Sequence, residues 1–579
     1  MTFRAKPVVK RVQKPSWESR DRRNFYLNIG FGLVVLAALL ILAVAFALSY
    51  YNDHLASVGS INGQTITRDA LRDRFNIENW RLDEAERRIS TQTVAGRLTQ
   101  AQADVQTQFI DQQRQNLAGI ALERIIDNRI QADLASQEGV TVTDADIDAR
   151  LTTEATTLET RHAWQIEVAP QVAAGAAEPT ADQIATARAT ADKALADLKS
   201  GKPWDDIAKT VSTDTATAPQ AGDLGWLQAE DGQTDEAFLK ALFAAQVDQP
   251  TDVVAGADGT FRIGRVSEIA PESVDQAYSE KIANDDIDIA KYREVVRGDV
   301  IRQKLEDKLV ADASKPGPQR EVTEIYLSQA TVDLPAEAVK VRHILYSPKD
   351  DPTAAQNGEI PAEDPSWAQA KTDADAAFAR IKADPILFDS IARADSDEES
   401  ARGADGTGGV LGAYVSTDSS YVPSFSKPIM DAKPTDGQLI GPIKTEFGYH
   451  IVQVINHKPD LAAIKVRIDG GADVAAIARD VSEGQEASTG GGLGWIAKGQ
   501  LEKPLIDAIF AAPIGKASDV VTMPNEGGQY LFKVTAEEER TPEGRQLDQI
   551  RSRLFQDWYQ PKKDALTIER DQTLTAPAG

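Results

Sequence analysis

Two histidines, His343 and His450, lie in segments whose sequence pattern predicts β-strands. In VKVRHILYS, alternation of residue type places Val341 and His343 on one face, and in GPIKTEFGYHIVQV it places His450 and Val452 on one face. A neutral imidazole both donates and accepts hydrogen bonds. Two imidazoles beside an apolar pocket can form a fixed polar wall for catalysis. Alternatively, they can be a structural pair that holds two strands in register, or two ligands of a metal site.

The segment between these strands supplies the other candidate groups. An amphipathic helix is predicted around Phe378, with apolar residues at helical spacing. The run FDSIARADSDEES follows and contains Glu398, and the glycine-rich run GTGGVLGAY and the run YVPSF come next. A carboxylate and several large apolar side chains therefore stand between the two histidines.

Residues 339–458 resemble the parvulin family of peptidyl-prolyl isomerases. The resemblance implies that His343, Glu398 and His450 are the catalytic residues. It also implies a set of substrate-binding residues: Leu411, Tyr421, Phe425, Thr445 and Phe447. This chain departs from the family at two of these positions. Glu398 is longer than the usual Cys or Asp, and Tyr421 adds a hydroxyl to an aliphatic position.

The chemistry implied by this family needs no nucleophile and no cofactor. Rotation about an X–Pro bond crosses a barrier of ~20 kcal/mol because the amide is conjugated. An apolar cup that grips the proline ring, with polar groups that favour the twisted amide, lowers that barrier. A metal site built from His343, His450 and Glu398 is the competing interpretation. The apolar residues around them fit a proline pocket better, so we expect neither metal nor cofactor.

Composition limits the remaining possibilities. The chain has 579 residues and a formal net charge of −26, so we expect several domains and no nucleic-acid partner. It contains no cysteine, which excludes disulfides, a thiol nucleophile and an N-terminal lipidated cysteine. The resemblance to parvulins implies that the partners are unfolded or nascent exported polypeptides that contain X–Pro bonds.

The N-terminal region predicts a membrane anchor. Residues 1–28 form a basic tail, and residues 29–51 form an apolar segment long enough to span a membrane as one helix. Positive charge before the span predicts a cytoplasmic N-terminus and an extracytoplasmic remainder. A signal peptide cleaved near Ala45–Ala47 is the alternative, but the long apolar run and its flanking tyrosines favour an uncleaved anchor.

Residues 52–160 predict a helical domain that resembles the N-terminal chaperone domain of SurA-, PrsA- and PpiD-like foldases. Thr67 and Thr143 are the expected N-caps of two helices, and Gly139 is the expected C-cap between them. Residues 271–338 are expected to be a helical segment that packs back on this domain. Residues 541–579 are expected to form a C-terminal helix and a disordered tail.

A glycine-leucine motif occurs three times, as AGDLGW, GGVLGA and GGLGW. It indicates a degenerate parvulin-like copy at 161–270, the parvulin domain at 339–458, and a truncated copy at 459–540. In the first copy, Gln165 is expected at the first histidine position, unless His162 takes that role. Phe261 is expected at the second position, and Asp214 keeps the carboxylate.

In the third copy, Tyr530 replaces the second histidine and Gly484 the carboxylate, and no first strand follows Lys458. We therefore expect peptide-binding or scaffolding roles for the first and third copies. The sequence predicts an α+β multidomain protein with three α/β repeats, each an antiparallel sheet flanked by helices. The function expected is that of a membrane-anchored isomerase and chaperone. A non-catalytic holdase and a metal-dependent hydrolase are the alternatives.

Overall fold

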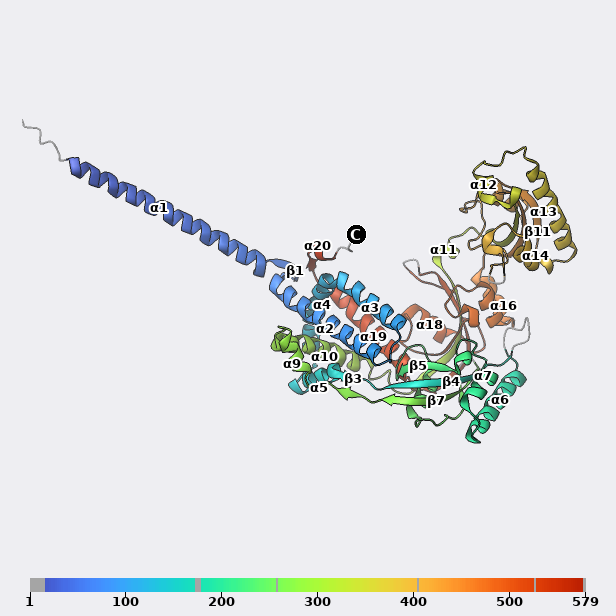
Figure 1. Ribbon diagram of the computed structural model, residues 1–579, viewed down its shortest axis with the longest axis horizontal. Coiled ribbons are helices and arrows are strands. Elements are labelled where there is room, and N and C mark those ends of the chain that lie inside the picture. The colour runs from blue at the N-terminus through green and yellow to red at the C-terminus, as the bar shows by residue number, and fades with distance from the viewer. Residues whose placement is uncertain (1–15, 172–178, 257–258, 404–405, 525–526, 576–579) are drawn as a thin grey trace, which may run out of the picture.

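The computed structural model describes residues 16–171, 179–256, 259–403, 406–524 and 527–575. These residues form a long N-terminal helix, a helical unit and three units built on antiparallel sheets (Figure 1). The mixed helix-and-sheet, multidomain class predicted from the sequence is confirmed. Residues 1–15 of the expected basic tail lie outside the described residues.

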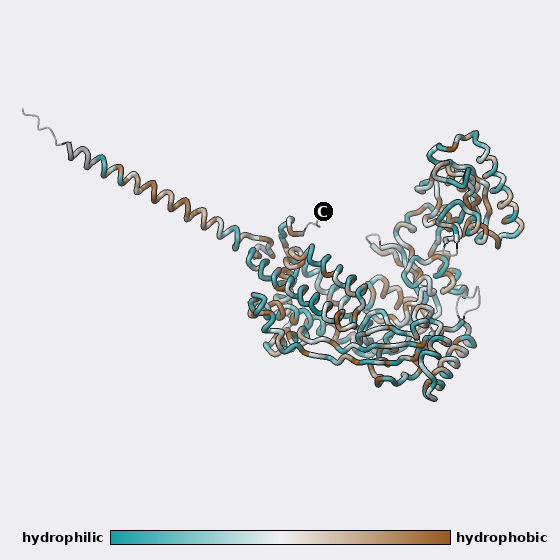
Figure 2. Tube along the Cα trace, viewed as in Figure 1, coloured by the Kyte–Doolittle hydropathy of each residue, from teal (hydrophilic) through white to brown (hydrophobic). Residues whose placement is uncertain are grey.

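Helix α1 (Ser16–Tyr50) carries the apolar run. From Arg23 to Leu55 the chain is helical, and it is long and apolar enough to cross a membrane. Its most apolar stretch is not buried against the rest of the chain, and Figure 2 shows this hydrophobic helix projecting from the body. At its base, Nδ1 of His54 lies 3.0 Å from the Asp69 carboxylate, which fixes the helix to the unit that follows.

The helical unit is assembled from three separate parts of the chain. Its elements are β1 (Ser57–Ile61), β2 (Gln64–Thr67), α2 (Arg68–Val94), α3 (Gln100–Gln115), α4 (Leu117–Gln137), α5 (Asp144–Ala155), α9 (Tyr278–Asn284), α10 (Ile289–Val310), α19 (Gly544–Asp564), β16 (Ile568–Arg570) and α20 (Gln572–Thr575). Leu122 of α4, Leu305 of α10 and Phe555 of α19 share one apolar core. Thr67 and Thr143 cap α2 and α5 as expected.

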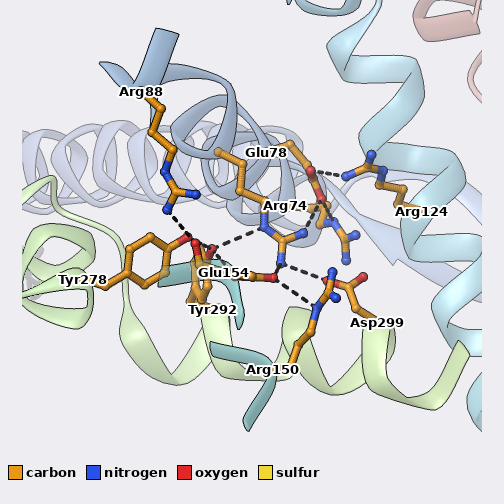
Figure 3. Close-up of polar contacts among 10 residues, drawn as sticks. Arg74, Glu78, Arg88, Arg124, Arg150, Glu154, Tyr278, Tyr292 and Asp299 are labelled. Atoms are coloured by element: carbon orange, nitrogen blue, oxygen red, sulfur yellow. Dashed lines mark hydrogen bonds and ion pairs between the residues drawn. The ribbon is translucent and has the colours of Figure 1, made fainter. Parts of the chain in front are cut away.

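A buried network of charges also joins the parts of this unit (Figure 3). Glu78 is 4% exposed and accepts a hydrogen bond of 2.7 Å from Arg74 on the same helix. Arg81 donates to Glu154 of α5 at 3.0 Å and to Asp299 of α10 at 2.9 Å. Buried carboxylates are tolerated only when they are paired in this way. The network therefore fixes α10 against α2 and α5.

The three repeats form three units, each built on an antiparallel sheet with the same strand order. The first copy has the sheet order β5 (Asp223–Gln228), β4 (Thr160–Val168), β7 (Phe261–Ala270), β6 (Val254–Ala255), with helices α6 (Ala181–Lys199), α7 (Trp204–Val211) and α8 (Glu236–Ala244). The middle copy has the order β10 (Val339–Tyr346), β12 (Tyr449–His457), β11 (Leu439–Lys444), with helices α13 (Pro365–Ala383), α14 (Leu387–Asp395) and α15 (Pro423–Asp431). Val410 and Val415 bridge to β10 where the other copies have their edge strand.

The third copy corrects the prediction of a truncated domain. Its sheet order is β13 (Gly492–Ala497), β9 (Gly317–Leu327), β15 (Gln529–Arg540), β14 (Val521–Thr522), with helices α16 (Leu461–Asp469), α17 (Val474–Val481) and α18 (Lys503–Ala511). The first strand, β9, precedes the middle copy in the chain and pairs with both β13 and β15. The middle copy is therefore inserted between the first strand and the first helix of the third.

Two further expectations are corrected by the same long-range pairing. The segment 271–338 is helical in α9 and α10, but it continues into β9, which belongs to the third sheet rather than to the helical unit. The C-terminal tail is predicted to be disordered. In its described part β16 instead pairs with β1, because the exposed edge of that small sheet offers unpaired backbone groups, and residues 576–579 lie outside the described residues. Figure 1 shows the middle copy at the opposite end of the protein from α1.

Candidate active site

The two histidines of the middle copy lie side by side on adjacent strands. His343 of β10 is paired with Val452 of β12, and His450 is paired with Leu345, so the imidazoles are diagonal neighbours on one face. Their Nδ1 atoms are 3.0 Å apart, and the rings are nearly parallel at 12°. Each residue is 5% exposed. The sequence-predicted pairing of these residues at one site is present in the structure.

The histidine pair is neutral and continues a hydrogen-bonded chain. Burial lowers the pKa of His343 to about 4, and burial together with the charge of His343 lowers the pKa of His450 well below its usual range. Nε2 of His450 lies 2.8 Å from Oγ1 of Thr445, which accepts a hydrogen bond from the Phe447 N–H. Nε2 of His343 is buried and has no hydrogen-bond partner among the described residues. The series of hydrogen bonds that begins at Thr445 and runs through both imidazoles thus ends at Nε2 of His343.

An aromatic cup covers the histidine pair. The Phe425 ring is 3% exposed and meets His343 and His450 edge to face, with centroids 5.8 and 5.0 Å apart. Tyr421 lies 5.8 Å from Phe425, and Leu411 packs against the same apolar cluster. The Tyr421 hydroxyl donates to the Ala413 carbonyl at 3.3 Å. The extra hydroxyl of Tyr421 is therefore satisfied by backbone, and its ring remains part of the cup.

Glu398 stands apart from the histidine pair. Its carboxylate accepts a hydrogen bond from the Ser400 hydroxyl at 3.2 Å, and within the described residues no hydrogen bond joins it to either histidine. Its backbone N–H donates to Ser396 at 3.3 Å. Ser396 in turn accepts from the Leu345 N–H at 3.2 Å and fastens this loop to β10. Glu398 is therefore held at the border of the site by Ser396, a positioning residue that the sequence interpretation had not singled out.

Ser396 has an equivalent in both other copies, which is the signal that identifies its role. Ser212 accepts from the Glu167 N–H at 3.2 Å, and Ser482 accepts from the Tyr326 N–H at 3.0 Å. The serine of each copy fastens the loop after the second helix to the first strand. Comparison of the three copies within this one chain therefore detects a contact that the middle copy alone does not reveal.

A glycine in each copy fixes which residues are equivalent at the first histidine position. Gly222, Gly409 and Gly491 have φ of +84°, +84° and +76°. A Cβ there would lie 1.8, 2.0 and 2.3 Å from the carbonyl oxygens of Gln165, His343 and Glu324, respectively. Only glycine allows this approach of two backbones. Gln165, as predicted, and Glu324, which was missed, therefore take the place of His343.

The second histidine position needs one correction. In the first copy, Arg262 is paired with Glu167 as His450 is paired with Leu345, so Arg262 and not Phe261 is the equivalent residue. Neighbouring residues of a strand point to opposite faces, so Phe261 faces the core. His162 does not take the first position, since its Nε2 contacts Asp223 at 2.9 Å. Tyr530 is confirmed at the second position of the third copy by its pairing with Tyr326.

The three copies therefore carry different side chains at the positions equivalent to His343 and His450. Gln165 donates to Asp214 at 2.8 Å in the first copy, and the imidazole pair occupies the middle copy. Among the described residues no group of three or more His, Cys, Asp or Glu is arranged to hold a metal ion. The geometry of the middle copy consequently favours a neutral polar wall behind an apolar cup.

Comparison with known proteins agrees with this division into copies. The sequence model of a family described as PPIC-type PPIASE domain matches residues 343–456, and a second model with the same description matches 159–268 and 460–538. The chaperone SurA of Methylobacillus flagellatus is 25% identical over 318 residues, which are 48% of this chain and 68% of that protein. The foldase protein PrsA of Geobacillus sp. is 32% identical over 108 residues, or 18% of this chain and 38% of that protein.

Among solved structures, a SurA-like chaperone of Campylobacter jejuni is 19% identical, with a TM-score of 0.20, over 44% of this chain and 98% of that chain. The family models together match more than half of the sequence, and the matched residues contain strands of all three sheets, although β9 of the third sheet lies outside them. The chain therefore belongs to the PPIC-type, or parvulin, peptidyl-prolyl isomerase family, and its relatives are the SurA and PrsA foldases.

Proposed function

We propose that this chain is a membrane-anchored foldase whose middle copy isomerises X–Pro bonds of exported polypeptides. The observation that carries the proposal is the buried pair His343–His450, with Nδ1 atoms 3.0 Å apart, beneath the Phe425 ring. Leu411, Tyr421 and Phe425 form the cup for the proline ring. Thr445 orients His450 through its hydroxyl, and the backbone N–H of Phe447 orients Thr445.

The site acts by favouring the twisted amide over the planar one. Twisting removes conjugation, so charge shifts from the carbonyl oxygen and the proline nitrogen becomes a better hydrogen-bond acceptor. The neutral imidazole wall supplies dipoles that are already oriented, so no reorganisation is needed during rotation. Nε2 of His343, which is buried and has no hydrogen-bond partner among the described residues, is the ring nitrogen that we assign to the substrate. Glu398 contributes an electrostatic effect at the border of the site, since its carboxylate is held by Ser400 rather than by a histidine.

The first and third copies are proposed to bind peptide without catalysing isomerisation. Neither has the imidazole pair, because Gln165 with Arg262 and Glu324 with Tyr530 occupy those positions. A charged side chain, or an amide already held in a hydrogen bond, interacts with solvent differently from a neutral imidazole. The helical unit, which resembles the chaperone domain of the relatives, is proposed to hold unfolded clients near the middle copy.

The anchor is proposed from two features of the N-terminal region. Helix α1 is apolar and unburied, and basic residues precede the span while none follows it directly. Lys and Arg remain on the cytoplasmic side of a membrane. The helical unit and all three sheets are therefore proposed to be extracytoplasmic.

An assay that separates an isomerase from a holdase tests the proposal. Residues 52–579 are added to a Leu-Pro peptide, and the cis-to-trans rate is measured beside the aggregation of an unfolded proline-free protein. We expect acceleration of isomerisation together with suppression of aggregation. Suppression of aggregation without any acceleration would identify a non-catalytic holdase instead.

A further inference from the structure

The third copy replaces the histidine wall by an acidic and aromatic one. Glu324 stands at the position of His343, and Tyr530 at the position of His450. The rings of Tyr326 and Tyr530 lie 4.7 Å apart. Burial, followed by the charges of Tyr326 and Glu324, raises the pKa of Tyr530.

The apolar cup itself is retained in the third copy. Leu493 follows the close-approach glycine by two residues, as Leu411 does in the middle copy. Leu505 is the third residue of α18, as Phe425 is the third residue of α15. Leu493 and Leu501 are half-buried against one cluster that also contains Leu505, Phe532 and Tyr530. A side chain with an apolar stem therefore has a surface to pack on.

The Glu324 carboxylate lies next to Gly484, the position at which the other copies have an acidic residue. Its Oε1 lies over Gly484, so that a Cβ on this glycine would be only 2.7 Å away. Gly484 stands where the other copies have Asp214 and Glu398. Each copy thus has one carboxylate in this region, but in the third copy it comes from the first strand rather than from the loop.

The Glu324 carboxylate has no partner among the described residues, in contrast to its counterparts in the other copies. Asp214 accepts hydrogen bonds from Gln165 and Thr217, and Glu398 accepts one from Ser400. No hydrogen bond or ion pair of the Glu324 side chain occurs in the part of the chain that the structure describes. Burial, followed by the nearby charge of Glu486, raises its pKa. A half-buried carboxylate without a counter-ion is a group that gains from binding a cation.

We propose that the third copy binds an Arg or Lys side chain of a client polypeptide, with the cation between Glu324 and the rings of Tyr326 and Tyr530. A cation is attracted to the faces of aromatic rings within about 6 Å, and the carboxylate adds a charge-assisted hydrogen bond. The aliphatic stem of the bound residue packs against Leu493 and Leu501. The proposal adds a client feature to the foldase function, but it does not depend on isomerisation by the middle copy.

The test compares two labelled peptides that differ only in charge. Each is apolar and free of proline, and its central residue is either arginine or citrulline, which has nearly the same shape but no charge. Binding to the full chain in detergent is measured by fluorescence anisotropy. We expect the arginine peptide to bind about tenfold more tightly. Glu324→Gln should remove the preference, and Tyr530→Leu should reduce it.

Matched controls locate the effect. Asp214→Asn in the first copy should leave the preference unchanged, and so should Tyr530→Phe, which keeps the ring. Hydrogen exchange of β9 and β15 shows that each variant is folded, and Leu-Pro isomerisation should equal that of the wild type. Equal binding of the two peptides by the wild type, or a preference that survives in Glu324→Gln, would overturn the proposal. Both outcomes leave the isomerase assay of the middle copy unaffected.

Discussion

The backbone N–H of Lys458 donates to the carbonyl of Ala338 at 2.7 Å. These residues stand at the two ends of the middle copy. The polypeptide therefore leaves the third copy and returns to it at adjacent points. The Lys458 ammonium also donates to the carbonyls of Val332 and Leu334. The middle copy is therefore joined to the rest of the chain by a short double connection, and its cores are its own.

Excision of residues 335–460 should give a folded and active domain. Its sheet, helices and histidine pair all lie within that range, and domains with their own core fold alone. The remaining chain, closed by a short Gly-Ser linker, should also fold, because the ends of the insertion are adjacent. Circular dichroism and peptide isomerisation of both pieces check this. Loss of structure in the remaining chain would show that the insertion supports β9.

Isomerase activity should be insensitive to pH over the usual histidine range. The pKa of His343 is lowered to about 4, so the pair remains neutral as the pH falls from about 8 to about 5. The value of kcat/KM should be level over that interval and fall only near pH 4. A pH profile of the wild type is the measurement. An inflection near pH 6.5 would mean that an ordinary, exposed histidine controls the rate.

The same lowered pKa has a consequence for stability. Between pH 6.5 and about 4, the unfolded chain binds a proton at this histidine while the folded chain does not. The free energy of unfolding therefore falls as the pH falls through this window, and it is fully restored above pH 6.5. For His343 the loss amounts to roughly 3 kcal/mol. Replacement of His343 by Gln should flatten this dependence in denaturant titrations.

Much of the site could be predicted from local sequence, because its strands alternate cleanly. His343 and His450 each stand in such a run, and the glycine-leucine motif contains Leu411 of the apolar cup. The first strand of the third copy could not be found in this way. Its partners β13 and β15 follow the whole inserted domain, and pairing over that distance leaves no mark in local spacing.

The other errors also concern pairing rather than element type. Phe261 and Arg262 are neighbours in one strand, and a shift of one residue exchanges the two faces. The sequence gives the strand but not its register, which only the partner β4 defines. Likewise, β16 is a three-residue strand that becomes recognisable only beside β1 at the other end of the chain.

Peptides with a negative charge before proline should be poor substrates. The loop between β10 and α13 carries Asp350, Asp351 and Glu359, and its one lysine, Lys349, already pairs with Asp364 at 2.9 Å. A phosphate brings nearly two negative charges and finds no free basic partner in this loop. Each unfavourable contact between like charges costs about 1 kcal/mol at a separation of roughly 4 Å in water. Leu-Pro and Lys-Pro peptides should thus turn over roughly tenfold faster than Glu-Pro or phosphoserine-Pro peptides.

The turnover rates of these four peptides are best measured in competition, with all four in one sample. Competition removes differences in enzyme concentration, and raised salt provides a control, since it should narrow the difference between charged and neutral peptides. Faster turnover of the Glu or phosphoserine peptide would contradict the expected effect of the loop.

Replacement of Glu78 should destabilise the helical unit strongly. Burial raises the pKa of Glu78, but the charges of Arg74, Arg81 and Arg124 outweigh that effect and lower it. Glu78→Gln leaves these arginines without their shared carboxylate, at a cost of about 3–5 kcal/mol. Hydrogen exchange of α2 and α4 measures the loss. The exposed pair Lys503–Asp507 is the control, and Asp507→Asn should cost less than about 1 kcal/mol.

The central claim is that one histidine pair accounts for the isomerase activity of the whole chain. The most direct measurement is the Leu-Pro isomerisation rate of residues 52–579 with His343→Ala and His450→Ala together. His457→Ala serves as the matched control, since His457 lies on the same strand but is partly exposed and paired with Asp436. We expect a loss of at least about a hundredfold in the double variant, equivalent to roughly 3 kcal/mol of barrier, and none in the control. A double variant that retains most of its activity would contradict the account.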